Sequence, residues 1–261
     1  MLQYLSEKRK GGGFTQEFRK EYLGSGITCF VSDEHTFGTD AVLLADFASP
    51  RARTVCCDLG SGCGIIPLLW CKGKTGRITA VEIQEKGARQ IEEAVNFNSL
   101  EDKIEVLNAD LRDLKGKLPF GAYGLVTMNP PYTAEGSGII SESGADKIAR
   151  HGTMCTLADV CLSAAKLLNF GGRLCMCIRP ERLCELFGYM REAGIEPKRM
   201  KFVSKTDGKA PWLALVEGKK GGKPGMFIDP ELHIYGKDGG YSDEMKEIYK
   251  DYLLENRRES E

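Results

Sequence analysis

The sequence predicts an α/β protein built on a seven-stranded, mainly parallel, doubly wound sheet that ends in an antiparallel hairpin. Short apolar runs alternate with helical patterns along residues 54–194, which is typical of a parallel sheet covered on both faces. Two later strand patterns, 199–204 and 212–217, are joined by a polar loop and predict the hairpin. We expect residues 1–53 to form an N-terminal elaboration packed on the main domain, residues 54–261, in one globular unit.

Each element follows from a local pattern. Strands are read from short apolar runs, and helices from apolar residues spaced three and four apart. Thr39 or Asp40 is expected to cap the first helix, Thr156 and Asp159 resemble a capping box, and Gly171-Gly172 predicts the end of that later helix. In chain order we expect a helix beginning within 37–45, strand 54–58, helix 65–71, strand 77–81, helix 84–100, strands 104–107 and 124–128, helix 156–168, strand 173–178, helix 180–193, the hairpin, and helix 242–253.

Composition excludes several classes of protein. Apolar residues make up 42% and charged residues 28%, the balance of a globular protein. The apolar runs fall short of the roughly 20 residues that a membrane span needs, and residues 1–20 show no secretory pattern. We therefore expect a cytoplasmic protein with no membrane partner. The formal net charge is −1, so any contact with nucleic acid must use local positive charge.

The ten cysteines are expected to be reduced thiols rather than disulfides or metal ligands. No Cys-x-x-Cys occurs, and the Cys175-x-Cys177 pair has no second ligand pair at zinc spacing, so no metal site is predicted. Most cysteines stand in apolar runs, which predicts burial of Cys56, Cys57, Cys71, Cys161, Cys175, Cys177 and Cys184.

A glycine cluster follows the first predicted strand of the main domain. Asp58-Leu59-Gly60-Ser61-Gly62-Cys63-Gly64 lies between a strand and a helix. Three alternating glycines exceed what a turn needs, and they let backbone N–H groups approach a ligand. The spacing is Gly-x-Gly-x-Gly rather than the Gly-x-Gly-x-x-Gly of dinucleotide sites, which favours a nucleoside ligand without a pyrophosphate.

Acidic residues follow the next two strands. Glu82 lies 22 residues after Gly60, at the tip of the second strand, where a carboxylate can accept hydrogen bonds from ribose hydroxyls. Asp110 follows the third strand and could accept from an adenine amino group, although an aspartate in a loop is also a common cap.

The most specific motif is Asn129-Pro130-Pro131-Tyr132, at the end of the strand expected at 124–128. The prolines fix the backbone and remove two N–H donors. The Asn129 side-chain carbonyl and the Pro130 backbone carbonyl remain as acceptors, and Tyr132 supplies a flat face. This array suits a planar group that carries an –NH2.

These motifs together resemble the class I S-adenosylmethionine-dependent methyltransferases with a Rossmann-like fold, in their Asn-Pro-Pro-Tyr amino-methylating branch. More narrowly, the chain is similar to the tRNA (adenine-N6) methyltransferases that modify adenine 37 of a valine tRNA. The resemblance covers about residues 20–255 and is carried by segments 37–44, 58–64, 81–84, 129–132, 148–151 and 241–244.

The resemblance implies roles for individual residues. Thr39 and Asp40 would lie near the methionine end of the cofactor, Glu82 would hold its ribose, and Asp110 its adenine. Asn129, Pro130, Pro131 and Tyr132 would form the catalytic motif and hold the target base. The full set expected at the cofactor is Thr39, Asp40, Asp58, Gly60, Gly62, Gly64, Glu82, Ile83, Asp110, Leu111 and Asn129.

Basic residues provide candidate contacts to tRNA. Residues 196–224 contain eight basic and three acidic residues. The basic residues include Lys198, Arg199, Lys201 and Lys205. Arg150 and His151 end a glycine- and serine-rich segment, 135–151, that could close over a substrate or be only a loop. Such a charge run also suits an ordinary solvated face.

Alternatives remain open at this point. A protein-glutamine N5 methyltransferase acting on a release factor would use the same motif, because an amide nitrogen is conjugated like an adenine amino group. Another nucleic-acid amino-group methyltransferase is also compatible, as is a module that only binds S-adenosylmethionine. The glycine spacing disfavours a nicotinamide dehydrogenase. The sequence identifies no protein partner.

Overall fold

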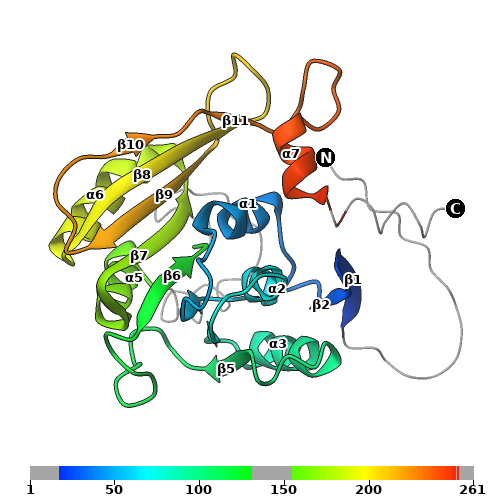
Figure 1. The fold of residues 1–261 in the computed structure, drawn as a ribbon, viewed down its shortest axis with the longest axis vertical. Coiled ribbons are helices and arrows are strands. Elements are labelled where there is room, and N and C mark those ends of the chain that lie inside the picture. Colours follow the sequence, from blue (N-terminus) through cyan, green and yellow to red (C-terminus); the bar gives the residue numbers. More distant parts are fainter. Residues whose placement is uncertain (1–17, 131–154, 251, 253–261) are drawn as a thin grey trace, which may run out of the picture.

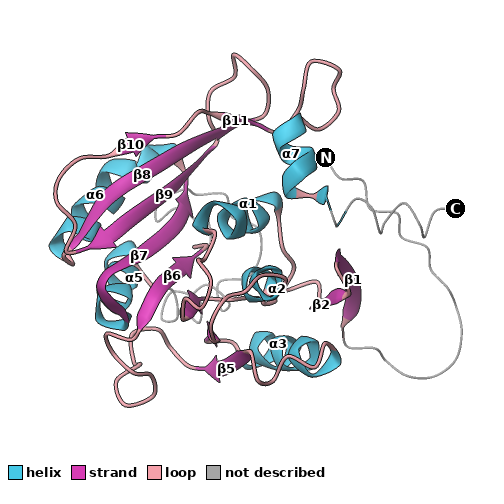
Figure 2. Cartoon of the chain, in the orientation of Figure 1, coloured by secondary structure: helices cyan, strands magenta, loops and turns pink. Residues whose placement is uncertain are grey.

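A mixed β-sheet runs through the molecule, with helices on both of its faces (Figures 1 and 2). The computed structural model describes residues 18–130, 155–250 and 252. The strands lie in the order β10-β8-β9-β7-β6-β3-β4-β5, and β11 also pairs with β8. Their bounds are β3 Cys56–Leu59, β4 Ile78–Glu82, β5 Ile104–Asn108, β6 Tyr123–Met128, β7 Leu168–Ile178, β8 Ile195–Ser204, β9 Leu213–Lys220, β10 Phe227–Ile228 and β11 Leu232–His233.

The seven longer strands confirm the predicted sheet. Strands β3 to β7 pair in parallel, and β9 is antiparallel to both β7 and β8, which gives the terminal hairpin. The hairpin strand β9 lies between β7 and β8, so the last long strand is inserted into the sheet. The sequence did not predict β10 and β11, because strands of two residues carry no periodic pattern.

Successive residues of a strand point to opposite faces of the sheet, so the sheet has a hydrophobic core on each face. On β3, Cys56 packs into the core beneath α1, α2 and α3, and the next residue, Cys57, packs into the core beneath α5 and α6. Figure 1 shows α1, α2 and α3 in succession on one face of the sheet. The helix bounds are α1 Thr39–Ala48, α2 Ile65–Cys71, α3 Glu85–Phe97, α5 Leu157–Leu167, η1 Pro180–Arg182, α6 Leu183–Glu192 and α7 Asp243–Ile248.

One predicted helix cap is present and two predicted helix ends are wrong. The Thr156–Asp159 capping box is present at α5, and the Ser242 side chain caps α7. The first helix, in contrast, has Gly38 at its N-cap and no side-chain cap, so neither Thr39 nor Asp40 has the capping role. Gly171 and Gly172 do not end α5, because that helix passes directly into β7, where both glycines lie in an irregularity of the pairing with β6.

An antiparallel hairpin of β1 (Arg19–Gly24) and β2 (Ile27–Val31) precedes α1, and it was not predicted. Side chains in α3 and at its C-cap form hydrogen bonds to the backbone of the hairpin. The Asn98 side chain accepts from Thr28 N at 2.8 Å and donates to Thr28 O at 2.7 Å, while Gln90 Nε2 donates to Phe30 O at 2.6 Å. The hairpin is therefore held against α3, and Cys29 Sγ lies 3.5 Å from the Cys63 carbonyl oxygen in the glycine turn that follows β3.

Seven of the ten cysteines are buried, and all ten are free thiols. Burial raises the pKa of Cys56 to about 12 and that of Cys161 to about 12. Two of the burial predictions were wrong, because Cys184 is exposed and Cys71 is only half-buried. No described helix is long and apolar enough to cross a membrane.

Candidate active site

A cleft of about 980 Å³ opens at the carboxyl ends of the parallel strands. It lies where the strand order reverses, between β3 and β6, which is the usual ligand position in a doubly wound sheet. Nine predicted cofactor residues and Pro130 line it, and Thr39 and Gly64 do not. The nine are Asp40, Asp58, Gly60, Gly62, Glu82, Ile83, Asp110, Leu111 and Asn129.

The glycine turn between β3 and α2 uses conformations that suit glycine. Gly60, Gly62 and Gly64 have φ angles of +62°, +57° and +77°, in the left-handed region. A Cβ on Gly64 would lie 3.0 Å from Ile91, so this glycine also allows α3 to pack closely. A Cβ on Gly62 would meet nothing within 4 Å, which leaves the backbone there open to the cleft. The glycine turn therefore leaves space for a nucleoside group beside its backbone.

Asp58 ties the turn to two strands. Its carboxylate is buried and accepts from Ser61 Oγ at 2.7 Å and from Thr127 Oγ1 at 2.6 Å. Burial raises the pKa of this carboxyl to about 7, against the opposing effect of the two hydroxyl donors. Asp58 thus holds the shape of the turn, and both of its oxygens are already engaged.

Glu82 ends β4 and faces the turn. Its Oε2 accepts from Gly62 N at 2.8 Å, and its Oε1 accepts from Gln84 N at 2.9 Å. A carboxylate has about four acceptor positions, so two backbone donors leave each oxygen able to accept from one hydroxyl. This arrangement suits the two vicinal hydroxyls of a ribose.

Asp110 has a partner that the sequence analysis missed. Arg112 donates to it from Nε at 3.0 Å, from Nη2 at 2.5 Å and from its backbone N at 2.8 Å. The guanidinium lowers the pKa of the Asp110 carboxyl. The pair fixes the orientation of Asp110 and uses much of its acceptor capacity. A basic residue two positions after an aspartate is too common a pattern to have predicted this pair.

Asn129 follows β6, and its side chain is held from both ends. Its Nδ2 donates to Asp40 Oδ2 at 2.9 Å, and its Oδ1 accepts from Cys177 Sγ at 2.9 Å. Asp40 lies in the first turn of α1 and Cys177 in β7. The structure therefore brings together two residues that the sequence analysis singled out separately, and adds Cys177, which was expected only to be a buried thiol.

His35 is a further residue of the cleft that the sequence analysis missed. Its side chain is buried, and its Nε2 has no hydrogen-bond partner among the described residues. His35 Cε1 would lie 3.3 Å from a Cβ placed on Gly87, so the ring packs against the start of α3. A lone histidine in a loop carries no motif.

Several expected residues lie outside the described part of the chain. They are Pro131, Tyr132, Arg150 and His151, together with the whole of segment 135–151 in which a closing loop was considered. The flat face expected of Tyr132 and the phosphate contacts expected of Arg150 and His151 remain predictions.

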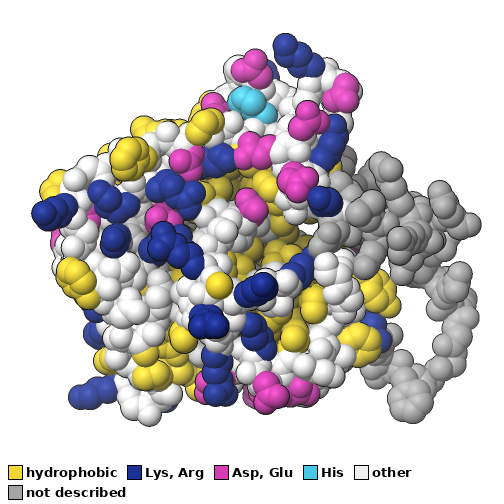
Figure 3. All heavy atoms as spheres, viewed as in Figure 1, with side chains coloured by type: hydrophobic (Ala, Val, Ile, Leu, Met, Phe, Trp, Pro, Cys, Tyr) yellow, Lys and Arg dark blue, Asp and Glu magenta, His cyan; other side chains and the backbone are white. Residues whose placement is uncertain are grey.

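The side chains of three of the four described residues predicted to contact RNA have partners within the fold. Arg199 pairs with Glu217 and Asp229, each at 3.1 Å, Lys201 pairs with Glu244, and Lys198 donates to the backbone carbonyl of Lys223 at 3.0 Å. Lys205 is exposed on the loop between β8 and β9. Figure 3 shows basic and acidic side chains interspersed over this face. Two of the basic residues of the segment, Arg199 and Lys201, are thus paired with carboxylates within the fold, which the sequence count did not reveal.

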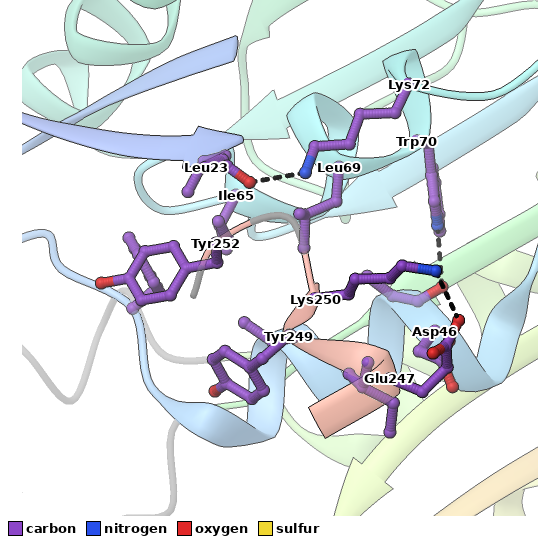
Figure 4. Close-up of a pocket in the computed structure, with 14 residues that line it drawn as sticks. Leu23, Asp46, Ile65, Leu69, Trp70, Lys72, Glu247, Tyr249, Lys250 and Tyr252 are labelled. Carbon is purple, nitrogen blue, oxygen red and sulfur yellow. Dashed lines mark hydrogen bonds and ion pairs between the residues drawn. The ribbon is translucent and has the colours of Figure 1, made fainter. Parts of the chain in front are cut away.

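A second cavity, of about 330 Å³, lies between α1, α2 and α7 (Figure 4). Its lining is mainly apolar and includes Leu69, Trp70 and Tyr252. Lys72 donates to the Leu23 carbonyl at its edge, as Figure 4 shows. None of the described predicted site residues lines this cavity. In the described part of the chain, no three His, Cys, Asp or Glu side chains are placed to hold a metal ion.

The doubly wound sheet, the glycine turn and the acidic residues after β4 and β5 define an S-adenosylmethionine-dependent methyltransferase. The chain belongs to the methyltransferase small domain family, whose model matches residues 25–187.

Its relatives share most of its length. A tRNA1(Val) (adenine(37)-N6)-methyltransferase of Tolumonas auensis is 27% identical over 219 residues, covering 83% of this chain and 89% of the relative. A protein of the same name from Parabacteroides distasonis is 27% identical over 222 residues, covering 83% and 90%. The crystal structure of a predicted O-methyltransferase of Agrobacterium tumefaciens shares the fold, with a TM-score of 0.64, 19% identity and coverage of 82% and 97%.

Proposed function

We propose that this enzyme transfers a methyl group from S-adenosylmethionine to the exocyclic N6 of an adenine in tRNA, at position 37 of the anticodon loop. The observation that carries the proposal is the oriented Asn129 amide, which is followed by Pro130 at the carboxyl end of β6. The names of the relatives from Tolumonas auensis and Parabacteroides distasonis support the substrate and the position.

The residues of the cleft fit the cofactor. Gly62 would approach it through the backbone, Glu82 would accept from the ribose hydroxyls, and the Asp110–Arg112 pair would lie at the adenine. Ile83 and Leu111 would supply apolar contacts beside it. When bound, the cofactor supplies an electrophilic methyl on a sulfonium sulfur.

The chemistry assigned to the protein is positioning and charge stabilisation. The adenine amino lone pair is conjugated with the ring, which makes it a poor nucleophile. Asn129 Oδ1 and the Pro130 carbonyl would accept its two hydrogens, and this favours the tetrahedral nitrogen that can attack in line. In that attack the N–C bond would form as the sulfonium S–C bond breaks, and the cationic nitrogen would then release one proton to water. Asparagine is not a base at neutral pH, so the proton leaves after transfer.

Access to the base is easier in a loop than in a duplex. An unpaired anticodon-loop adenine costs less to extrude than a paired one. We propose exposed Lys205, together with Arg150 and His151, as phosphate contacts. We assign no RNA contact to Arg199 or Lys201, because their charges are paired within the fold. We also propose that residues 1–53 complete the single unit of 54–261, since α1 packs against β7.

The test is a methyl-transfer assay with labelled S-adenosylmethionine and three substrates: unmodified tRNA, duplex DNA and a release-factor protein. The labelled product is digested and identified by mass spectrometry. N6-methyladenosine from tRNA, formed much more slowly by Asn129→Ala and absent when a transcript carries guanosine in place of A37, supports the proposal. Label in protein alone would move the chemistry to glutamine, and label in DNA alone would reject the RNA substrate.

A further inference from the structure

The Asn129 amide is held by groups from two distant parts of the chain. Asp40 Oδ2, in the first turn of α1, accepts from Nδ2 at 2.9 Å, and the Cys177 thiol, in β7, lies 2.9 Å from Oδ1. The two partners lie 89 and 48 residues away in sequence. The two ends of the amide are therefore distinguished by their surroundings.

The carboxylate determines which end of the amide faces it. An ionised carboxylate only accepts hydrogen bonds, so it can face the amide –NH2 but repels the amide oxygen. The opposite orientation would bring two acceptors together, and would present –NH2 where an acceptor is needed for an incoming amino group. The thiol on the other side is a weak donor and is compatible with the oxygen there.

The absence of a side chain at Gly38 leaves room for the Asp40 carboxylate. A Cβ on Gly38 would lie 2.5 Å from Asp40 Oδ1, closer than real contacts allow. Gly38 has a φ of −112°, which any residue can adopt, so backbone conformation does not explain a glycine there. The space it leaves is filled by the carboxylate.

We propose that Asp40 is a positioning residue that fixes the orientation of the Asn129 amide, with Gly38 providing the space, rather than a direct cofactor ligand. By accepting an N–H hydrogen bond, the carboxylate also polarises the amide and makes Oδ1 a stronger acceptor. This inference rests on the proposed function for its catalytic consequence. It differs from the role that the family resemblance implies for Asp40, which is contact with the methionine end of the cofactor.

The decisive variant is Asp40→Asn. An asparagine can offer either an oxygen or an –NH2 to Asn129, so the amide of Asn129 is free to invert. We expect kcat for methyl transfer to fall about tenfold to a hundredfold. The dissociation constant of S-adenosylmethionine, measured by calorimetry, should change by less than about twofold. Asp40→Glu, which keeps the carboxylate, should recover part of the loss.

A double-mutant cycle separates the two roles of Asp40. If Asp40 acts through Asn129, the Asp40→Asn/Asn129→Ala enzyme is no slower than Asn129→Ala alone. The matched control is Asp46→Asn, the same change on the same helix at a residue that lines the second cavity and not the cleft. Losses that multiply, or a cofactor affinity that falls in parallel with kcat, would overturn the proposal and make Asp40 a cofactor ligand.

A spectroscopic measurement keeps the inference independent of the substrate. The side-chain amide protons of Asn129, assigned by NMR from the Asn129→Ala spectrum, should shift in Asp40→Asn and in Gly38→Ala, and not in Asp46→Asn. Resonances that stay unchanged in Asp40→Asn would refute the positioning role even if no substrate is methylated. Shifted resonances in an enzyme that is inactive on every substrate would leave the positioning role standing and count against the proposed function.

Discussion

A buried carboxylate that is protonated near neutral pH makes stability depend on pH. The pKa of Asp58 is raised to about 7 by burial in the native state, against about 3.9 in an unfolded chain. Between these values the native state holds a proton that the unfolded state releases. The stability contributed by Asp58 is therefore fully present below about pH 4 and is lost as pH rises through about 7.

The first prediction compares the wild type with Asp58→Asn, which does not titrate. The free energy of unfolding of the wild type, relative to the variant, should fall by up to about 4 kcal/mol between pH 4 and pH 8. Urea unfolding at several pH values measures it, and the difference cancels the other titrating groups. A difference that is independent of pH would contradict the raised pKa.

The second prediction concerns Gly87, in the first turn of α3. A Cβ there would lie 2.9 Å from Glu82 Cγ and 3.2 Å from the Gly62 carbonyl oxygen, so Gly87→Ala displaces Glu82. Alanine favours a helix by about 1 kcal/mol over glycine, and this gain offsets the loss of unfolding free energy caused by the close contact. We expect S-adenosylmethionine to bind about tenfold more weakly, by loss of roughly one good hydrogen bond, with unfolding changed by less than about 1 kcal/mol.

The control for Gly87 is Gly188→Ala in α6, where a Cβ would meet nothing within 4 Å. It should leave cofactor affinity unchanged. Equal affinities for all three proteins would show that Glu82 does not bind the cofactor.

At the residue scale, nine of the residues predicted for the cofactor site line the cleft, but the sequence did not predict what they touch. The glycine cluster and Glu82 were readable because they lie directly after strands, whose carboxyl ends share one edge of the sheet. The contact between Asp40 and Asn129 could not be predicted from the sequence, because it joins segments 89 residues apart and depends on side-chain orientation. The internal pairing of Arg199 and Lys201 was hidden for the same reason.

At the element scale, the alternating strands and helices from residue 54 onward were predicted well, and the first hairpin and the two-residue strands were missed. The helix at 65–71 agrees residue for residue, because a strand and glycines bound it on one side. The β1–β2 hairpin was missed although Gly24 and Gly26, both with positive φ, mark its turn. Its first strand, Arg19–Gly24, begins with charged residues and shows no clear alternation, so the apolar second strand had no recognisable partner in the sequence.

The third prediction tests the attachment of this hairpin through Asn98, the C-cap residue of α3, whose side chain bonds to the hairpin. Asn98→Ala leaves the buried backbone N–H and C=O of Thr28 without their partners, which we expect to cost about 2 kcal/mol of unfolding free energy. Hydrogen exchange at Thr28 should accelerate. The control Asn96→Ala, at an exposed position in α3, should change stability by less than about 0.5 kcal/mol. Equal stabilities of the two variants would contradict the argument.

At the scale of the whole molecule, the sequence predicted a seven-stranded doubly wound sheet but not the order of its strands. The insertion of β9 between β7 and β8 depends on contacts among residues far apart, which local patterns do not encode. One group of charges spans this insertion. Glu217, in β9, lies 2.7 Å from Arg173 Nη1 of β7 and 3.1 Å from Arg199 Nη2 of β8.

The same two arginines connect the sheet to α1. Arg173 Nη2 donates to the Ala48 carbonyl at 2.9 Å, and Arg199 Nη2 donates to the Phe47 carbonyl at 2.7 Å. Positive charge at the carboxyl end of a helix is favourable, because the last carbonyls are unsatisfied there. Glu217 thus balances two cations that join three strands to the helix whose opposite end carries Asp40.

The fourth prediction is that Glu217→Gln destabilises the whole fold. The side chain keeps its size, but two partly buried guanidinium groups lose their shared carboxylate, at a cost of about 2 kcal/mol of unfolding free energy. The cost is below that of a fully buried pair because Arg199 is 32% exposed and is also paired with Asp229. The control Glu185→Gln breaks an exposed pair on α6 and should cost less than about 0.5 kcal/mol. Glu217 connects three strands directly, and α1 through Arg173 and Arg199, so Glu217→Gln should lower the midpoint of a single unfolding transition. A separate early transition would show instead that α1 is held independently of the sheet.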